Sequence, residues 1–208
     1  MINHERFIFI IKESGMPSFS DREFRDLRYG AGDVMSDMSF DNCSFHHCMF
    51  DACTFERCRF HGCNFTSCSF VSPLPKNTDM RFCDFRNCLF LAVSFMSFVN
   101  DEYIRTPVNS LQDCKIRNSL FHEMSFPGYD FSSNRFSQCE FSECVLNNAS
   151  FRDCNLSGTS FSNSDLRGAD FRKSDGYVID IFNNKLKGAK FSSPEVLDLL
   201  SGLQIVVE

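Results

Sequence analysis

Every fifth residue from Phe40 to Phe70 is a phenylalanine. Read in fives from residue 43, the segment runs CSFHH CMFDA CTFER CRFHG CNFTS CSFVS, with a cysteine two places before each phenylalanine. A second run keeps Ile, Phe or Leu at every fifth position from Ile116 to Phe171. Helices repeat apolar residues about every 3.6 residues and flat strands every second residue, so a period of five fits neither. The chain must therefore turn through a fixed angle every five residues and stack turn upon turn, as a solenoid does.

These units resemble those of the pentapeptide-repeat family, A(D/N)LXX, in which a large apolar residue follows a small one two places later. The clearest units are ASFRD (149–153), CNLSG (154–158), SDLRG (164–168) and ADFRK (169–173), and the resemblance covers residues 40–192. It implies an all-β fold, a right-handed quadrilateral β-helix with four five-residue sides per coil. The central Phe or Leu would point inward and stack on its equivalent twenty residues later. A short C-terminal helix and strand would follow.

Length and composition fit one soluble domain. The 208 residues are 43% apolar, which is enough for a continuous core. The longest apolar stretch, Phe7–Ile11, is too short to span a bilayer and has no small-residue cleavage site after it. We therefore expect a bacterial cytoplasmic protein that does not enter a membrane.

All twelve cysteines stand at the small position of the repeat, at 43, 48, 53, 58, 63, 68, 83, 88, 114, 139, 144 and 154. Consecutive cysteines would lie on different sides of a coil and could not converge on a zinc ion. Same-side cysteines, about 4.8 Å apart in the backbone, would have parallel side chains unsuited to a disulfide. We expect buried, reduced packing residues, with adventitious oxidation or metal binding as the weaker alternatives.

The repeat divides the chain into three parts. Residues 1–18 lack it and are a cap, an extension or a segment upstream of a start at Met16. Residues 19–192 form the β-helix, with an irregular loop expected at 71–79 because it contains two prolines. A register break falls at 96–110, which is either a harmless bulge or a contact loop. Residues 193–208 follow the repeat.

The C-terminal segment predicts a helix capped by Ser193 and started by Pro194, and then a strand at 204–207. The helix would carry an apolar stripe at i, i+3, i+4 and i+7. A solenoid needs its open end covered, but this surface exceeds what one coil needs and favours a homodimer. The candidate dimerisation residues are Val196, Leu199, Leu200, Leu203, Ile205 and Val207.

Residues 177–208 also resemble the end of the albicidin-resistance pentapeptide proteins, which are relatives of the quinolone-resistance Qnr proteins. That resemblance implies a tail-to-tail homodimer that binds DNA gyrase, or the related topoisomerase IV, and protects it from poisons. It implies no cofactor and no direct binding of nucleic acid.

Enzymatic activity has little support in the sequence. Catalysis needs a pocket with convergent polar groups, and a coil filled by stacked phenylalanine has none. No Ser/His/Asp set, phosphate-binding glycine loop or metal motif appears, so we predict no catalytic, cofactor-binding or metal-binding residues.

Bulk charge supports DNA mimicry only weakly. A dimer at −6 per chain carries −12, whereas duplex DNA of the same length, on the order of 75–80 Å, would hold roughly 45 phosphates. The charge is clustered, however. One predicted side, built on positions 121, 141, 161 and 181, bears Glu123, Glu140, Glu143 and Asp180 with no Lys or Arg. The side built on 131, 151 and 171 mixes both signs and predicts an ordinary solvated face.

The leading hypothesis is a non-catalytic, DNA-mimicking gyrase-binding protein. The gyrase-binding candidates are Glu123, Glu140, Glu143 and Asp180, with Asp101 and Glu102 in the 96–110 segment as a second contact. An ordinary solvated surface remains the alternative for the acidic side. The competing function is a pentapeptide-repeat interaction scaffold or effector with an unrelated partner, and a third is direct sequestration of a planar drug.

Overall fold

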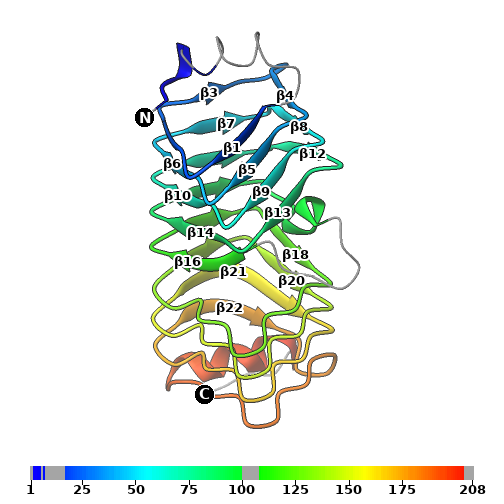
Figure 1. Ribbon diagram of the computed structural model, residues 1–208. Helices are drawn as coiled ribbons and strands as arrows, with labels where there is room; N and C mark the ends of the chain where they lie inside the picture. Colours follow the sequence, from blue (N-terminus) through cyan, green and yellow to red (C-terminus); the bar gives the residue numbers. More distant parts are fainter. Residues whose placement is uncertain (1, 6, 8–16, 100–107, 204–208) are drawn as a thin grey trace. The chain divides into compact units, whose positions relative to one another are not determined.

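The computed structural model describes residues 2–5, 7, 17–99 and 108–203. Its backbone contacts divide the chain into two units, residues 1–115 and 116–208. Within each unit, short parallel strands stack on one another and are joined by tight corners (Figure 1). The strand β17 (Lys115–Arg117) spans the boundary between the units in the sequence.

Unit 1 has four sides, each a parallel sheet, so its cross-section is a quadrilateral. The first side contains β1 (Ser18–Ser20), β5 (Ser39–Asp41), β9 (Arg59–His61) and β13 (Asp79–Arg81). The second contains β2 (Glu23–Arg25), β6 (Ser44–His46), β10 (Asn64–Thr66), β14 (Cys83–Arg86) and β16 (Val108–Gln112). The third contains β3 (Arg28–Tyr29), β7 (Met49–Asp51), β11 (Ser69–Val71) and β15 (Leu89–Leu91). The fourth contains β4 (Val34–Ser36), β8 (Thr54–Glu56) and β12 (Leu74–Lys76). The predicted right-handed quadrilateral β-helix is confirmed.

The core of unit 1 is a set of phenylalanine ladders. Phe45 pairs with Phe65, and Phe65 with Phe85, at a repeat of one coil. The ring centroids of Phe45 and Phe65 are 4.7 Å apart and their planes differ by 9°. Along this side Phe24, Phe45, Phe65 and Phe85 stack in successive coils, and all four rings are buried. Burial of such rings is the main favourable term in the stability of the fold.

Backbone hydrogen bonds tie each coil to the next. The amide of Asn64 donates to the carbonyl of Cys43 (2.8 Å), and the amide of the corner residue His47 donates to the carbonyl of Thr66 (3.0 Å). Corner residues adopt the left-handed conformation, as His47 does with a φ of 55°. Residues that carry a side chain rarely adopt this backbone conformation. The repeat tolerates the strain because a corner amide such as that of His47 gains a hydrogen bond.

The twelve cysteines are buried and free of disulfides, as predicted. The thiol of Cys68 donates to the carbonyl of Phe45 (3.4 Å), and Ser164 fills the same place in unit 2, where its hydroxyl accepts from the amide of Cys144 (3.0 Å). Burial raises the pKa of the Cys144 thiol to about 12, which keeps it protonated at neutral pH. The cysteines therefore act as small polar packing residues.

The irregular loop expected at 71–79 is wrong, because the coil continues through this segment. Pro75 lies in β12 and pairs with Phe55 in regular register. The strand order β12-β8-β4 places Pro75 at a sheet edge, where a missing backbone N–H leaves no ladder bond unmade. Since proline has no aromatic ring to cover Phe55, Phe98 contacts Phe55 edge-to-face from the short 3-10 helix η1 (Phe95–Phe98), with ring centroids 6.0 Å apart. The repeat pattern did not show that a phenyl ring from outside the repeat, that of Phe98, could cover Phe55.

Two further segments of unit 1 lie at boundaries that the sequence predicts, namely the register break at 96–110 and the N-terminal cap. After η1, the described chain resumes at β16, which pairs Leu111 with Phe85 through a register shift. At the N-terminus, Phe7 is buried against Phe19 and Phe24, with ring centroids 5.7 and 5.4 Å away. Phe7 therefore covers the rings of the first coil, as a cap does.

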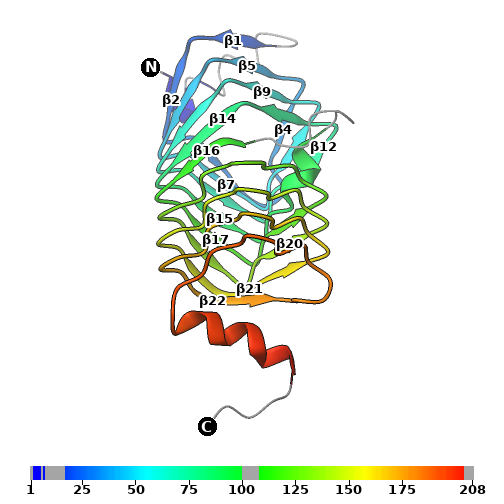
Figure 2. The same cartoon turned by 90° about the horizontal axis from the view of Figure 1, so that it is seen from below.

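Unit 2 repeats the stacked rings, but only two of its sides are strands. One pairs β18 (Leu120–His122), β20 (Glu140–Ser142), the end of β21 (Asn155–Ser162) and β22 (Asp175–Ile179). The other pairs β19 (Arg135–Ser137) with the start of β21. The remaining two sides form isolated bridges, such as Asp130 with Ser150 and Ser150 with Asp170. The 3-10 helix η2 (Glu195–Leu203) then leaves the last coil and packs against β22 (Figure 2).

The predicted phase of the last coil is wrong at one position. Phe161 pairs with Ile179, whereas the strict period of five expected position 181 at the centre of this side. The register shifts between Asn155 and Thr159, opposite Gly176, whose φ is 72°. The chain takes a shorter path around this corner, which a count in fives cannot detect.

Candidate interaction face

The side of unit 2 that carries the predicted acids is a regular sheet with a definite order of surface residues. We call it the acidic face and define it as residues 120–123, 140–143, 160–163 and 178–180. Its strands pair Leu120 with Glu140, Glu140 with Ser160, and Ser160 with Val178. The inward residues between them are Phe121, Phe141, Phe161 and Ile179, all buried. No Lys or Arg stands in these four segments, so their acids give the face a negative formal charge.

Three of the predicted acids lie together on this face. Glu123 and Glu143 occupy the same corner in successive coils, with φ values of 53° and 56°, and Glu140 lies on β20. Coils in a parallel stack are about 4.8 Å apart, so the two corner carboxylates repel each other weakly. His122 Nε2 lies 3.6 Å from Glu123 Oε1, and His122 Nδ1 lies 3.1 Å from the Ser142 hydroxyl. Glu140 and Glu143 are exposed and available to a cationic partner.

Asp180, the fourth predicted acid, is engaged inside its own turn. Its carboxylate accepts hydrogen bonds from the amides of Phe182 (2.9 Å) and Asn183 (3.2 Å) and from the Asn183 side chain (2.6 Å). These bonds, led by the one from the Asn183 side chain, lower the pKa of Asp180. The group keeps its charge, but its oxygens are directed into the turn.

Sequence reasoning missed the apolar residues of this region. Leu120 and Val178 are 46% and 54% exposed on the acidic face, and Phe182 is 77% exposed in the turn beside it. The period of five places position 181 at the centre of this side, and so it does not single out Phe182 as an exposed aromatic residue in a turn. The only signal in the sequence was an apolar residue, Phe182, directly after the expected central position 181.

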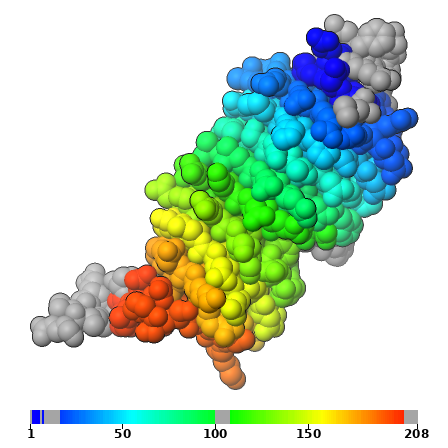
Figure 3. Space-filling model, turned by 90° about the vertical axis from the view of Figure 1, so that its left-hand side faces the viewer, coloured from blue at the N-terminus to red at the C-terminus, as the bar shows by residue number. Residues whose placement is uncertain are grey.

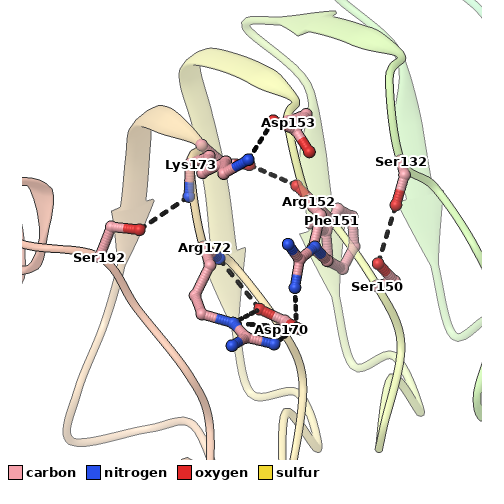
Figure 4. Close-up of polar contacts among 10 residues, drawn as sticks. Ser132, Ser150, Phe151, Arg152, Asp153, Asp170, Arg172, Lys173 and Ser192 are labelled. Atoms are coloured by element: carbon pink, nitrogen blue, oxygen red, sulfur yellow. Dashed lines mark hydrogen bonds and ion pairs between the residues drawn. The ribbon is translucent and has the colours of Figure 1, made fainter.

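Two sides further around the coil, opposite charges neutralise each other. Arg172 holds Asp170 through two nitrogens, and Arg152 Nη1 approaches the same carboxylate at 3.4 Å (Figure 4). The Arg172 hydrogen bond is the main cause that lowers the pKa of Asp170 to about 2. Lys173 Nζ lies 3.9 Å from Asp153 (Figure 4). This side is the mixed surface that the sequence predicted.

The remaining predicted contacts are only partly within the described residues. Asp101 and Glu102 lie outside them, as do Ile205 and Val207 and the side chain of Leu203. Val196, Leu199 and Leu200 are half-buried on η2, and Leu197 is exposed. Tyr177 Oη on β22 and Glu195 Oε2 on η2 are buried, and neither has a hydrogen-bond partner among the described residues. Burial, with the negative charges of Asp198 and Glu195, raises the pKa of Tyr177 to about 12.

Comparison with known proteins decides the family. A model described as the pentapeptide repeat region matches residues 114–195, and one described as pentapeptide repeats (8 copies) matches residues 35–71. Together the two segments cover more than half of the chain. It belongs to the pentapeptide-repeat family. No curated protein matches the sequence.

Two solved pentapeptide-repeat structures are similar to this pentapeptide-repeat protein at low identity. One is a trypsin-treated variant of QnrB1, a plasmid-mediated fluoroquinolone resistance protein, with 20% identity over 93% of this chain and 99% of that chain and a TM-score of 0.36. Another is HetL from the cyanobacterium Nostoc sp. strain PCC 7120, a protein involved in heterocyst differentiation regulation, with 13% identity over 91% and 93% and a TM-score of 0.42. At these values neither structure bears on the activity of this chain.

The pentapeptide-repeat surface has shallow hollows. The coils of unit 1 pack into a continuous surface on the side seen in Figure 3. One hollow of about 460 Å³ lies over β10, β14 and β16 and is lined by residues that include Asn64, Asp84 and Arg86.

Among the described residues, no group of three or more His, Cys, Asp or Glu side chains could hold a metal ion. Within the same residues, no helix is long and apolar enough to cross a membrane. Pentapeptide-repeat solenoids are typically structural or interaction scaffolds.

Proposed function

We propose that this pentapeptide-repeat protein binds DNA gyrase and protects it from topoisomerase poisons. The observation that carries the proposal is the acidic face, on which Glu123, Glu140 and Glu143 share one side of unit 2 and whose four segments contain no Lys or Arg. The resemblance of residues 177–208 to the albicidin-resistance proteins supports the choice of partner. Binding at the cationic surface where gyrase holds its DNA gate segment would disfavour the drug-stabilised cleavage complex.

The acids act as surrogates for phosphates on one face only. Glu140 extends from strand β20 and Glu143 from the corner at its end, and Glu123 repeats that corner position one coil earlier. Asp180 adds its charge from within its turn. Exposed ion pairs contribute about 0.2–1 kcal/mol each, so four carboxylates mainly steer the encounter and fix its orientation. The neutralised side around Asp170 takes no part.

The proposal includes a second copy of the chain, bound through η2. Leu197 is 51% exposed there, and Val196, Leu199 and Leu200 are only half-buried against the last coil. A second η2 would cover this apolar surface. The protein would work without cofactor or catalysis, in the bacterial cytoplasm where gyrase is found.

A supercoiling titration with gyrase, with and without albicidin or a fluoroquinolone, tests the proposal. We expect rescue of supercoiling at low protein concentration and inhibition at high concentration. The variant Glu123→Lys/Glu140→Lys/Glu143→Lys should lose both effects while remaining folded by circular dichroism.

A matched control reverses three exposed acids of unit 1, Asp26→Lys/Asp51→Lys/Asp113→Lys, with the same change in net charge. It should keep both effects. If the acidic-face variant and the control behave alike, the face is not the binding surface. If the unsubstituted protein has no effect on gyrase or topoisomerase IV, the function is that of a scaffold for another partner.

A further inference from the structure

The turn after β22 contains two more residues than the corresponding corner of the preceding coil. Asp180 follows Ile179 as Ser162 follows Phe161, and Asn184 occupies the place of Ser164. The Asn184 side chain accepts from the Ser164 amide (2.8 Å) and donates to the Phe161 carbonyl (2.8 Å), which returns the chain to regular register. One residue, Asn163, makes the earlier corner, whereas residues 181–183 make this one. The turn therefore projects from the corner.

Phe182 at the centre of this turn is exposed although the fold buries aromatic residues throughout its core. Among the described phenylalanines, only Phe82 and Phe182 are more than half exposed, at 53% and 77%. Phe82 has a ring contact with His61, at 5.6 Å. Leaving a phenyl ring in water forgoes the free energy that its burial would contribute. That free energy becomes available when a partner covers the ring.

The surroundings of Phe182 indicate the charge of that partner. The corner that carries Phe182 continues the column of Glu123, Glu143 and Asn163. Val178, 54% exposed, lies on the adjoining strand β22. Acidic side chains beside an apolar cluster complement a basic surface that contains an apolar pocket.

We propose that Phe182 is the aromatic anchor of the interaction, and that it inserts into an apolar pocket on a basic protein surface. The inference rests on the proposed function and names the residue that holds the complex together. Asp180 is a positioning residue, because its carboxylate holds the amides of Phe182 and Asn183 and so keeps the turn in one conformation. Buried aromatic anchors dominate the binding energy of many interfaces, and charges at the rim mainly set the association rate.

Binding kinetics with intact gyrase test this division of roles. We expect Phe182→Ala to raise the Kd at least tenfold, about 1.4 kcal/mol, through a faster dissociation rate. The slope of log Kd against log salt should not change, because no charge is removed. Phe182→Tyr should keep most of the affinity. The triple acidic-face variant should instead lower the association rate and flatten the salt dependence.

Phe82→Ala is the matched control, since it removes the other exposed phenyl ring, and it should bind as the unsubstituted protein does. Equal dissociation rates for Phe182→Ala and Phe82→Ala would overturn the anchor and leave the proposed function standing. If the unsubstituted protein does not bind gyrase, the proposed function and the anchor both fail. Thermal unfolding of each variant shows that the fold is unchanged, which a surface position in a turn predicts.

Discussion

The rings of Phe151 and Phe171 lie parallel, with centroids 5.0 Å apart and planes that differ by 3°. Phe131 covers the other face of Phe151 at 4.8 Å. Each ring in such a ladder is therefore both a core residue and the platform for the next coil. The loss of one ring leaves a cavity that neither neighbour can close, because the backbone bridges fix the distance between coils.

Phe151→Ala should accordingly lower the free energy of unfolding by about 3–5 kcal/mol. Phe151→Asp should yield no folded protein, because its carboxylate would be buried without a partner. Urea unfolding followed by circular dichroism measures both effects. Phe182→Ala is the control and should change stability by less than about 0.5 kcal/mol. A Phe151→Ala variant of normal stability would show that the ladder does not hold the fold together.

Gly176 and Gly188 allow two costs of adding a side chain to be measured separately, namely backbone strain in the left-handed region and steric overlap with a neighbouring coil. Their φ values are 72° and 77°. A Cβ at Gly176 would meet the Cα of Ser157 at 2.8 Å, whereas at Gly188 the nearest atom, the Cα of Gly168, is 3.9 Å away.

Gly188→Ala should therefore cost about 1 kcal/mol from backbone strain alone. Gly176→Ala should cost about 1–3 kcal/mol more, because of the overlap at the shortened corner. Chemical denaturation of the two variants checks the difference. Equal costs would mean that the corner can relax around a side chain.

Asp170 predicts a pH dependence with a definite sign. Its pKa is lowered from 3.8 to about 2 in the folded protein, so the ionised carboxylate stabilises the folded state above about pH 4. That stabilisation is lost as the pH falls from 4 through 2. It should be on the order of 1 kcal/mol, since the partner arginines are partly exposed and screened by solvent.

Unfolding free energies of the unsubstituted protein and Asp170→Asn, measured from pH 2 to 6, test this expectation. The difference between them should be constant above pH 4 and should shrink toward pH 2. Asp51→Asn, at an exposed position, should show little difference at any pH. A gap for Asp170→Asn that persists unchanged to pH 2 would contradict the ion-pair explanation.

Leu200→Arg tests the proposed homodimer. A charged side chain within the apolar surface of η2 should give a folded monomer, because a buried unpaired charge at the interface is costly. Light scattering coupled to size exclusion measures the mass. Val145→Arg, at an exposed position of unit 2 outside η2, should leave the mass unchanged. A Leu200→Arg protein that stays dimeric would exclude η2 as the contact.

The acidic face shows where reading the sequence succeeded and where it did not. Glu123, Glu140 and Glu143 could be placed on one side of unit 2 because the period of five assigns each residue a side and a direction. Asp180 was also placed on this side, but its position in the turn and the exposure of Phe182 could not be predicted, because the register shift opposite Gly176 displaces the chain by two positions within one coil. A periodic pattern contains no information on where a single coil departs from it.

Pro75 gives the same lesson in unit 1. The rule that proline interrupts strands predicted a loop, but the edge of a three-stranded sheet tolerates the missing N–H. The ring that covers Phe55 comes from Phe98, outside the regular repeat. Only the fold brings these two rings together.

The sequence by itself determined the architecture, because a large apolar residue every fifth position with a small residue two places before it can be buried in only one way. It also determined that the cysteines pack inside the coil and that Glu123, Glu140 and Glu143 share a face. The tertiary structure alone decided that Asp180 is bound within its own turn and that an exposed phenylalanine stands at the corner of that face. These features depend on local register shifts and on contacts between residues far apart in the chain, whose free-energy differences are small compared with those that select the fold.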